Sequence, residues 1–232
     1  MEAGDFKDFA KAMTDYIAEY LENIRDRPVV PLVKPGYLRP LVPEQAPDKA
    51  EPWTAVMADI ERVVMSGVTH WHSPRFHAYF PTANSYPAIV ADMLSGAIAC
   101  IGFTWVLTMT EMDLKLKFET MEAGDFKDFA KAMTDYIAEY LENIRDRPVV
   151  PLVKPGYLRP LVPEQAPDKA EPWTAVMADI ERVVMSGVTH WHSPRFHAYF
   201  PTANSYPAIV ADMLSGAIAC IGFTWVSWNY LH

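Results

Sequence analysis

Cysteine is nearly absent from this chain, which has only Cys100 and Cys220 among its 232 residues. Two cysteines do not make the disulfide framework that stabilises small secreted domains, so we expect a reducing, cytoplasmic compartment. Cys100 lies in the apolar run Ala97-Ile-Ala-Cys-Ile. A buried, unreactive thiol is the expected role in such a run, rather than a nucleophile.

Long apolar runs and basic clusters are also missing. No run approaches the roughly 18 apolar residues of a membrane span. The polar start Met-Glu-Ala-Gly-Asp-Phe-Lys does not read as a secretory signal. The net charge is −9, and no basic stripe interrupts it. A spread acidic balance argues against nucleic acid and anionic membranes as partners.

What the sequence does contain is an exact internal repeat. Residues 1–106 recur without a change as residues 121–226. The period is far longer than the roughly 20–50 residues of solenoid repeats. Such identity indicates a recent duplication, an engineered tandem or an error in assembling the sequence. We divide the chain into copy one (1–106), a linker (107–120), copy two (121–226) and a tail (227–232).

Three helices are expected in each copy. The first spans residues 5–25, with Gly4 or Asp5 as its cap. Its apolar stripe has helical spacing and comprises Phe6, Phe9, Ala10, Met13, Ile17, Tyr20, Leu21 and Ile24. An isolated helix of this length is marginal in water, so the stripe needs a partner surface. That surface belongs either to the same domain or to another subunit, and the stripe alone does not separate the two.

The second helix is expected from Trp53 to about Met65, opened by Pro52 and ended by Ser66-Gly67. Its predicted inner face comprises Trp53, Val56, Met57, Ile60, Val63 and Val64. The third helix is expected to start at Ser85 as its cap, with Pro87 in the first turn, and to run to Ile101. It is apolar nearly all round, so we expect its burial to need more protein than one copy supplies.

Residues 28–52 are rich in proline, with Pro28, Pro31, Pro35, Pro40, Pro43, Pro47 and Pro52. This favours an extended arm of polyproline character laid across a folded surface, over a recognition motif for an aromatic-lined groove. Pro35-Gly36 signals a turn. In the linker, apolar and charged residues alternate at strand period, while the residue types favour helix. We expect an ordered linker, with strand ahead of helix.

Residues 67–87 combine three histidines, several aromatics and three prolines. His70 and His72 share a face of an extended segment and are half of a possible metal site. Only His77 stands near to add a ligand, so hydrogen-bonded loop histidines are preferred. Tyr79-Phe80-Pro81-Thr82 suits one wall of a pocket for an aromatic ligand. The alternative is an aromatic core cluster.

Four motifs carry a family resemblance over the whole of each copy. They are Lys34-Pro-Gly-Tyr-Leu-Arg-Pro-Leu, Gly67-Val-Thr-His-Trp-His-Ser-Pro, Ala78-Tyr-Phe-Pro-Thr-Ala-Asn-Ser-Tyr-Pro and Ala91-Asp-Met-Leu-Ser-Gly-Ala-Ile-Ala-Cys-Ile-Gly-Phe-Thr-Trp. In this order they resemble the N-terminal part of animal aromatic-L-amino-acid decarboxylases, and especially of the insect dopa decarboxylases. The related aldehyde-forming synthases stay open as an alternative ancestry.

The resemblance implies a pyridoxal-phosphate enzyme that works as an intertwined homodimer, whose N-terminal helices clasp the partner subunit. It implies a mainly α fold of two identical three-helix units with Pro-rich extended arms, similar to the N-terminal dimerisation segment of a fold-type-I decarboxylase. By resemblance, one group of residues lines the pocket for the aromatic substrate, partly from the neighbouring subunit. These are Trp71, Tyr79, Phe80, Pro81, Thr82, Ile101 and Phe103, with Trp191, Tyr199, Phe200, Pro201, Thr202, Ile221 and Phe223 in copy two.

The departures from the family are large. The Schiff-base lysine of the family lies in a His-Lys pair, and no such pair occurs in this sequence. The groups that would make the coenzyme an electron sink are missing with it. We therefore assign no catalytic residue, and we expect pyridoxal phosphate, the family's cofactor, not to be bound by this chain.

Three interpretations follow. The first is a non-catalytic assembly module whose two copies pair with each other, or with other molecules by swapping. The second is an aromatic-L-amino-acid decarboxylase completed by another, full-length subunit. The third is an unfolded or aggregating relic with an exposed third helix.

Overall fold

The chain is helical, and no β-strand occurs in the residues that the structure describes. The mainly α prediction is therefore confirmed for that part of the molecule. The structure is a computed structural model, and it describes residues 1–34, 36–45, 47–78, 85–98, 121–154, 156–165, 169, 171–198 and 205–218. The linker and the tail lie outside these ranges, so the prediction of an ordered linker stays a prediction.

Copy one contributes α1 (Ala3–Glu22), α2 (Trp53–Asp59) and α3 (Tyr86–Ile98). The chain continues from α2 through a π-helical turn, η1 (Ile60–Val64), and a 3-10 turn, η2 (Met65–Gly67). In copy two the corresponding elements are α4 (Ala123–Glu142), η4 (Ile144–Asp146), α5 (Trp173–Asp179), η5 (Ile180–Val184), η6 (Met185–Gly187) and α6 (Tyr206–Ile218).

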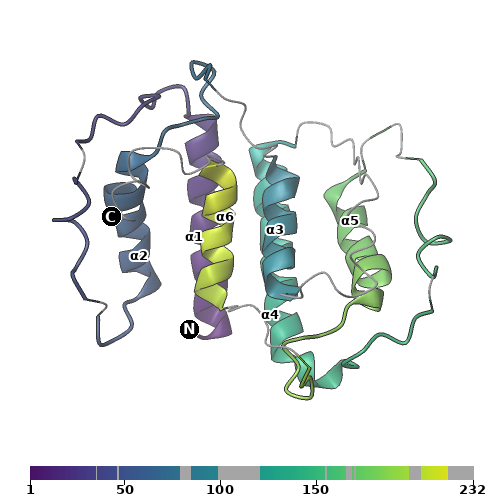
Figure 1. Cartoon of the computed structure of the whole chain (residues 1–232). Coiled ribbons are helices and arrows are strands. Elements are labelled where there is room, and N and C mark those ends of the chain that lie inside the picture. Colours follow the sequence, from purple (N-terminus) through teal and green to yellow (C-terminus); the bar gives the residue numbers. More distant parts are fainter. Residues whose placement is uncertain are drawn as a thin grey trace.

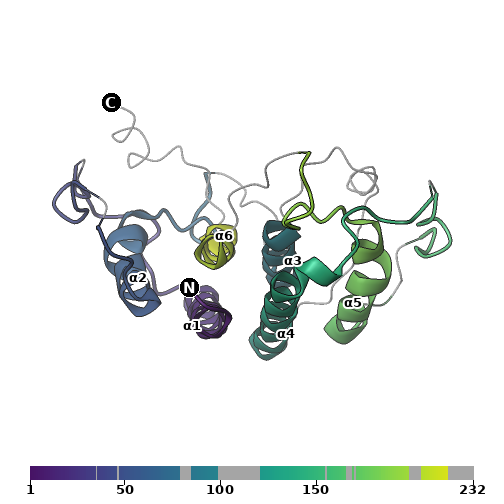
Figure 2. The same cartoon turned by 90° about the horizontal axis from the view of Figure 1, so that it is seen from below.

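Four helices form the centre of the molecule, two from each copy. α1 packs against α4 and α6, and α3 packs against the same two helices. α2 flanks α1 and α5 flanks α4, so the second helix of each copy lies at an outer edge (Figures 1 and 2). The third helix of each copy therefore packs on the first and third helices of the other copy.

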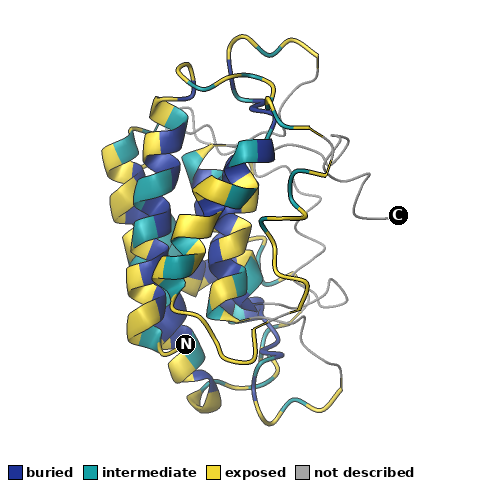
Figure 3. Ribbon diagram, turned by 90° about the vertical axis from the view of Figure 1, so that its left-hand side faces the viewer, coloured by how far each residue is buried: buried dark blue, intermediate teal, exposed yellow. Residues whose placement is uncertain are grey.

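One apolar core runs through these helices and contains residues of both copies. Figure 3 shows the buried faces turned inward and the exposed faces turned to solvent. The predicted stripe of the first helix is buried, except for Leu21, which is half-buried. Ile17 and Phe6 are fully enclosed, at 0% exposed.

The start of the first helix differs from the prediction. The helix begins at Ala3, and the amide of Phe6 donates to the carbonyl oxygen of Glu2 at 3.0 Å. Gly4 and Asp5 lie inside the first turn, so the prediction that one of them caps the helix is wrong. Ala3 is a strong helix former, so the helix begins two residues before the predicted start, ahead of the first apolar residue of the stripe. The helix ends at Glu22, before the predicted Arg25.

The second helix also departs from a regular pattern. Val56 is 41% exposed and Val64 is 44% exposed, so their assignment to the inner face is wrong. In copy two the equivalent Val176 and Val184 are partly buried against the core, although η5 is the same π-helical turn as η1. Val56 precedes that turn, on α2, which packs against α1.

The third helix starts as predicted. The Ser85 hydroxyl accepts a hydrogen bond from the Ala88 amide at 3.4 Å, and Pro87 lies in the first turn. Ile89 and Met93 are fully buried, whereas Asp92 is exposed. The helix is described to Ile98, so its predicted end at Ile101 lies outside the described residues.

The proline-rich residues 28–52 form neither helix nor strand at the positions that the structure describes. A turn occurs where Pro35-Gly36 predicts one. The Tyr37 amide donates to the Lys34 carbonyl at 3.1 Å, and Gly36 has φ 82°. This is the positive φ that the third residue of a type II turn requires. Within the described ranges, no helix is both long and apolar enough to span a bilayer.

Candidate functional site

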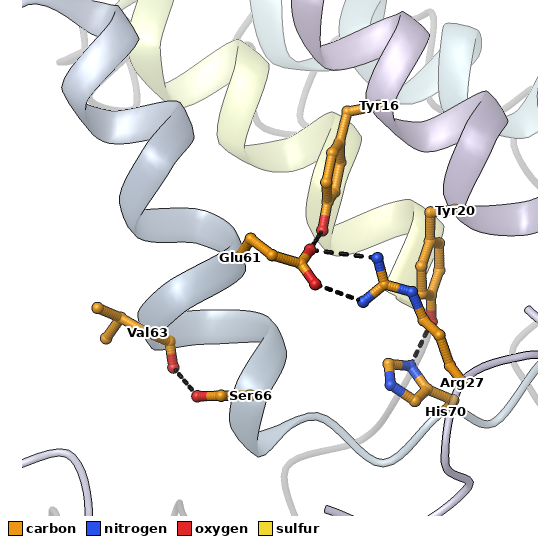
Figure 4. Close-up of polar contacts among 7 residues, drawn as sticks. All are labelled: Tyr16, Tyr20, Arg27, Glu61, Val63, Ser66 and His70. Atoms are coloured by element: carbon orange, nitrogen blue, oxygen red, sulfur yellow. Dashed lines mark hydrogen bonds and ion pairs between the residues drawn. The ribbon is translucent and has the colours of Figure 1, made fainter.

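The best-defined polar site lies where residues 68–78, which we call the aromatic segment, meet the end of α1. The backbone amide of His70 donates to the Val29 carbonyl at 3.0 Å. The His70 Nδ1 is hydrogen-bonded to the Tyr20 hydroxyl at 2.9 Å (Figure 4). The Arg75 guanidinium donates to the carbonyls of Arg25 at 2.5 Å and Arg27 at 2.9 Å. Both ends of the aromatic segment are thus tied to the chain that leaves α1.

Two consecutive turns give the aromatic segment its shape. The Ser73 amide donates to the His70 carbonyl at 3.0 Å, and the Phe76 amide donates to the Ser73 carbonyl at 2.9 Å. Pro74 occupies the second position of the latter turn, where the fixed φ of proline is favoured. The Ser73 hydroxyl accepts from the Arg75 amide at 3.3 Å, which braces the same turn.

Trp71 and Trp191 are the only predicted pocket residues within the described part of the chain. Trp71 is 4% exposed and stacks on Phe76, with ring centroids 5.5 Å apart and planes at 20°. Trp191 stacks on Phe196 in the same way at 5.4 Å. The other predicted pocket residues lie outside the described ranges: Tyr79, Phe80, Pro81, Thr82, Ile101, Phe103, Tyr199, Phe200, Pro201, Thr202, Ile221 and Phe223. Their role stays a prediction.

His70 is a buried, hydrogen-bonded histidine, as the preferred interpretation of the loop histidines has it. Burial, and next the positive charge of Arg27, lower the pKa of His70 to about 4. The ring is therefore neutral at pH 7. Burial also lowers the pKa of His72. Among the described residues, no group of three or more His, Cys, Asp or Glu side chains is arranged to hold a metal ion.

A carboxylate cluster of Tyr16, Arg27 and Glu61 joins α1 to η1, and sequence reasoning missed it. The Glu61 carboxylate accepts from the Tyr16 hydroxyl and from two Arg27 nitrogens, at 2.8 and 3.2 Å (Figure 4). The guanidinium of Arg27 also lies 5.2 Å from the ring centroid of Tyr20, within cation–π range. The one available signal was Tyr16, an aromatic residue beside the stripe at Ile17.

The charges of the carboxylate cluster are mutually adapted. Burial would raise the pKa of Glu61, but hydrogen bonds from Arg27 and Tyr16 outweigh it, and the pKa is lowered. Burial and the Glu61 carboxylate together raise the pKa of Tyr16. Glu61 is therefore ionised, and Tyr16 protonated, across the physiological pH range. The same cluster recurs in copy two around Glu181.

Reciprocal polar contacts join the two copies. Lys7 pairs with Asp135 at 2.9 Å, and Lys127 pairs with Asp15 at 2.9 Å. Both pairs lie at the surface, along the edge where α1 borders α4. The hydrogen bond and charge of Asp135 raise the pKa of Lys7.

Aromatic and carboxylate contacts repeat this reciprocity. Phe6 stacks on Tyr206, and Tyr86 stacks on Phe126, each with ring centroids 4.3 Å apart. At the crossing of α3 and α6, a Cβ on Gly216 would lie 3.5 Å from an Asp92 carboxylate oxygen. Burial and the charge of Asp212 raise the pKa of Asp92.

The lysines within the described ranges do not fit a Schiff-base role. Such a lysine is desolvated so that its pKa falls. Lys7, Lys11, Lys127 and Lys131 are instead ion-paired to aspartates at the surface. The remaining described lysines, Lys34, Lys49, Lys154 and Lys169, are exposed. Lys115 and Lys117 lie outside the described ranges.

The pyridoxal-dependent decarboxylase conserved domain matches residues 35–120 and again residues 155–229. These ranges cover more than half of the chain, which therefore belongs to the pyridoxal-dependent decarboxylase family. The first range includes the whole linker, so the family pattern continues past the end of the identical block. The resemblance predicted from the four motifs is confirmed.

Known relatives match one copy at a time. The chain is 90% identical over 107 residues to the aromatic-L-amino-acid decarboxylase of Manduca sexta. The matched residues make up 46% of this chain and 21% of that protein. The Drosophila melanogaster enzyme of the same name is 73% identical over 117 residues, or 50% of this chain and 23% of that protein. The chain thus spans about a fifth of the length of these relatives. A solved structure of Catharanthus roseus tryptophan decarboxylase with L-tryptophan matches at 44% identity, covering 47% of this chain and 24% of that chain, with a TM-score of 0.44.

Proposed function

We propose that this chain is a self-paired assembly module of the pyridoxal-dependent decarboxylase family, without catalytic activity of its own. The observation that carries the proposal is the shared centre of the molecule. α1 and α3 pack mainly on α4 and α6, and one core contains residues of both copies. Each copy thereby serves as the partner that the other needs to bury its third helix.

The absence of catalytic activity rests on what the chain contains. Its 232 residues include no His-Lys pair, and its described lysines are ion-paired or exposed. A pyridoxal-phosphate enzyme requires a lysine and a set of groups that hold and polarise the coenzyme. We infer that this chain lacks that set.

The pairing is favoured by both burial and tethering. Each fully buried apolar side chain contributes about 1.5–3 kcal/mol in transfer terms, before ordering costs that offset much of the gain. A linker of the length of residues 107–120 reaches at most about 50 Å when extended, which exceeds the size of either copy. Short tethers give effective concentrations of order millimolar.

Dilution tests the proposal. Internal pairing predicts a monomer by analytical ultracentrifugation, with a thermal transition that does not depend on protein concentration. Exchange of identical copies between chains predicts a dimer that dissociates on dilution. A chain that sediments as a monomer but lacks a cooperative transition would contradict the assembly module and favour the relic.

A second function is supported by the 90% identity to the Manduca sexta enzyme over one copy. In this alternative, a full-length subunit supplies the cofactor and lysine, and the pair decarboxylates aromatic L-amino acids. The test mixes the chain with an insect decarboxylase that keeps its Schiff-base lysine but from which the N-terminal segment has been deleted. Release of carbon dioxide from L-dopa only in the mixture would establish this function, and no release would exclude it.

A further inference from the structure

We propose that Tyr20 and Tyr140 are positioning residues, through which the pairing of the two copies fixes the aromatic segment that carries Trp71 or Trp191. The inference rests on the proposed function, because it requires the copies to pair. It adds that the pairing surface and the predicted substrate-facing segment are mechanically one unit. Neither the family match nor the names of the relatives assign these tyrosines a role.

The first step concerns where Tyr20 sits. Its ring is 1% exposed and belongs to the same stripe of α1 as Ile17. That stripe forms the core shared with α4 and α6. The ring of Tyr20 therefore belongs to the core that both copies share, while its hydroxyl is directed toward His70 (Figure 4).

The second step concerns what the hydroxyl holds. It meets the His70 Nδ1 at 2.9 Å, and His70 is itself 3% exposed. His70 directly precedes Trp71. Its backbone carbonyl accepts the hydrogen bond from the Ser73 amide that closes the first turn of the aromatic segment. A shift of α1 thus moves His70, the turn and Trp71 together.

The third step is a second anchor at the far end of the segment. Arg75 binds the carbonyls of Arg25 and Arg27, which follow α1 directly. Arg27 in turn pairs with Glu61 and lies over the Tyr20 ring. The contacts of His70 and Arg75 thus fix both ends of the aromatic segment to the end of α1. We therefore expect the segment to move together with the helix.

Every one of these contacts recurs in copy two. The Tyr140 hydroxyl meets His190 Nδ1 at 2.9 Å, and Arg195 binds the carbonyls of Arg145 and Arg147. The arrangement is therefore a property of the repeated sequence, and it places both tryptophans under control of the same four-helix centre. An aromatic ligand or a completing subunit would meet both segments already oriented.

The principal test changes Tyr20→Phe together with Tyr140→Phe. The rings stay in the core, but the contacts with His70 and His190 are lost. Both copies are changed because residues 68–78 and 188–198 have the same sequence and yield indistinguishable peptides in hydrogen-exchange mass spectrometry. We expect at least tenfold faster exchange in this shared peptide and unchanged exchange in α1. The near-ultraviolet circular dichroism of Trp71, assigned with a Trp71→Phe, Trp191→Phe reference, should weaken.

The matched control is Tyr16→Phe with Tyr136→Phe, one turn earlier on the same helices. It also removes a tyrosine hydroxyl, but one bonded to Glu61 or Glu181 and not to the aromatic segment. Its shared peptide and tryptophan dichroism should match those of the unchanged chain. Arg75→Lys with Arg195→Lys tests the exposed anchor without touching the core, and should also accelerate exchange in the peptide. Unchanged exchange in the Tyr20→Phe, Tyr140→Phe variant would overturn the inference, whatever the Arg75 variant shows.

Coupling to the pairing is tested from the opposite end of α1. Phe6→Ala with Phe126→Ala removes the stacks on Tyr206 and Tyr86, roughly 20 Å along the helix from Tyr20. We expect the thermal transition to move to a lower temperature and, in the same variant, the amides of residues 68–78 to exchange faster. If the unchanged chain pairs and the variant weakens pairing without affecting that peptide, the inference fails while the assembly module stands. If the dilution experiment shows that the two copies within the unchanged chain do not pair with each other, the proposed function itself fails.

Discussion

Replacing Ile17 by aspartate tests whether the first helix faces protein or water. Ile17 is 0% exposed on α1, within the core that both copies share. Ile17→Asp forfeits about 1.5–3 kcal/mol of apolar transfer free energy. It also leaves a carboxylate without a partner in an apolar site, which costs several kcal/mol more or forces the group to take up a proton. We expect a loss of roughly 4 kcal/mol or more from the free energy of unfolding.

The assay is thermal and urea denaturation followed by circular dichroism. For a domain of this size, each kcal/mol shifts the transition by about 2–4 °C, so Ile17→Asp should lower it by roughly 8–16 °C. Glu19→Asp is the matched control, because it places the same residue at an exposed position of the same helix. An unmoved transition in Ile17→Asp would mean that the stripe faces water, and the packing of α1 on copy two would have to be abandoned.

Four further outcomes are expected. Borohydride reduction with pyridoxal phosphate should give no stoichiometric adduct at a single lysine by mass spectrometry, and a unique full-occupancy adduct would contradict the assembly module. Amides in residues 107–120 should exchange slowly, and rapid exchange throughout would refute an ordered linker. Burial, and next the charge of Arg27, lower the pKa of His70 to about 4 in the folded chain, so stability should fall as the pH drops from the ordinary histidine range toward 4. His70→Gln with His190→Gln should flatten this dependence of stability on pH, and His77→Gln should not. Burial and the charge of Asp212 raise the pKa of Asp92, so the charged form of its carboxyl group is disfavoured. Asp92→Asn should therefore raise the temperature of the thermal transition at pH 7, but not at a pH below the ordinary carboxyl range.

Local periodicity predicted the parts of the fold that depend on neighbours in the chain. The stripe from Phe6 to Leu21 falls on one face of a helix, and any partner surface must cover that face. Ser85 caps the third helix because a hydroxyl before an apolar run satisfies an amide that the helix leaves open. These features follow from residues three or four positions apart, so the sequence alone sufficed.

Features that depend on distant or irregular geometry could not be predicted in this way. The apolar pattern after Trp53 is compatible with a straight α-helix, and nothing in it marks the π-helical turn η1. The carboxylate cluster joins Tyr16 to Glu61, 45 residues apart, and such a polar meeting leaves no periodic trace. The apolar character of the third helix indicated that more protein must cover it, but not that α4 and α6 would be that protein.

The repetition of the sequence also explains why the contacts between copies come in pairs. Two identical surfaces that meet symmetrically must form each contact twice, as Lys7–Asp135 and Lys127–Asp15 do at 2.9 Å. Such an arrangement closes on itself, whereas a contact between two different patches would leave one patch open on each molecule and permit chains of molecules to grow. Swapping between molecules would use the same paired contacts, because each copy offers the same surface wherever it resides. Dilution therefore measures how the copies are connected, while Ile17→Asp measures whether that surface is the one they use.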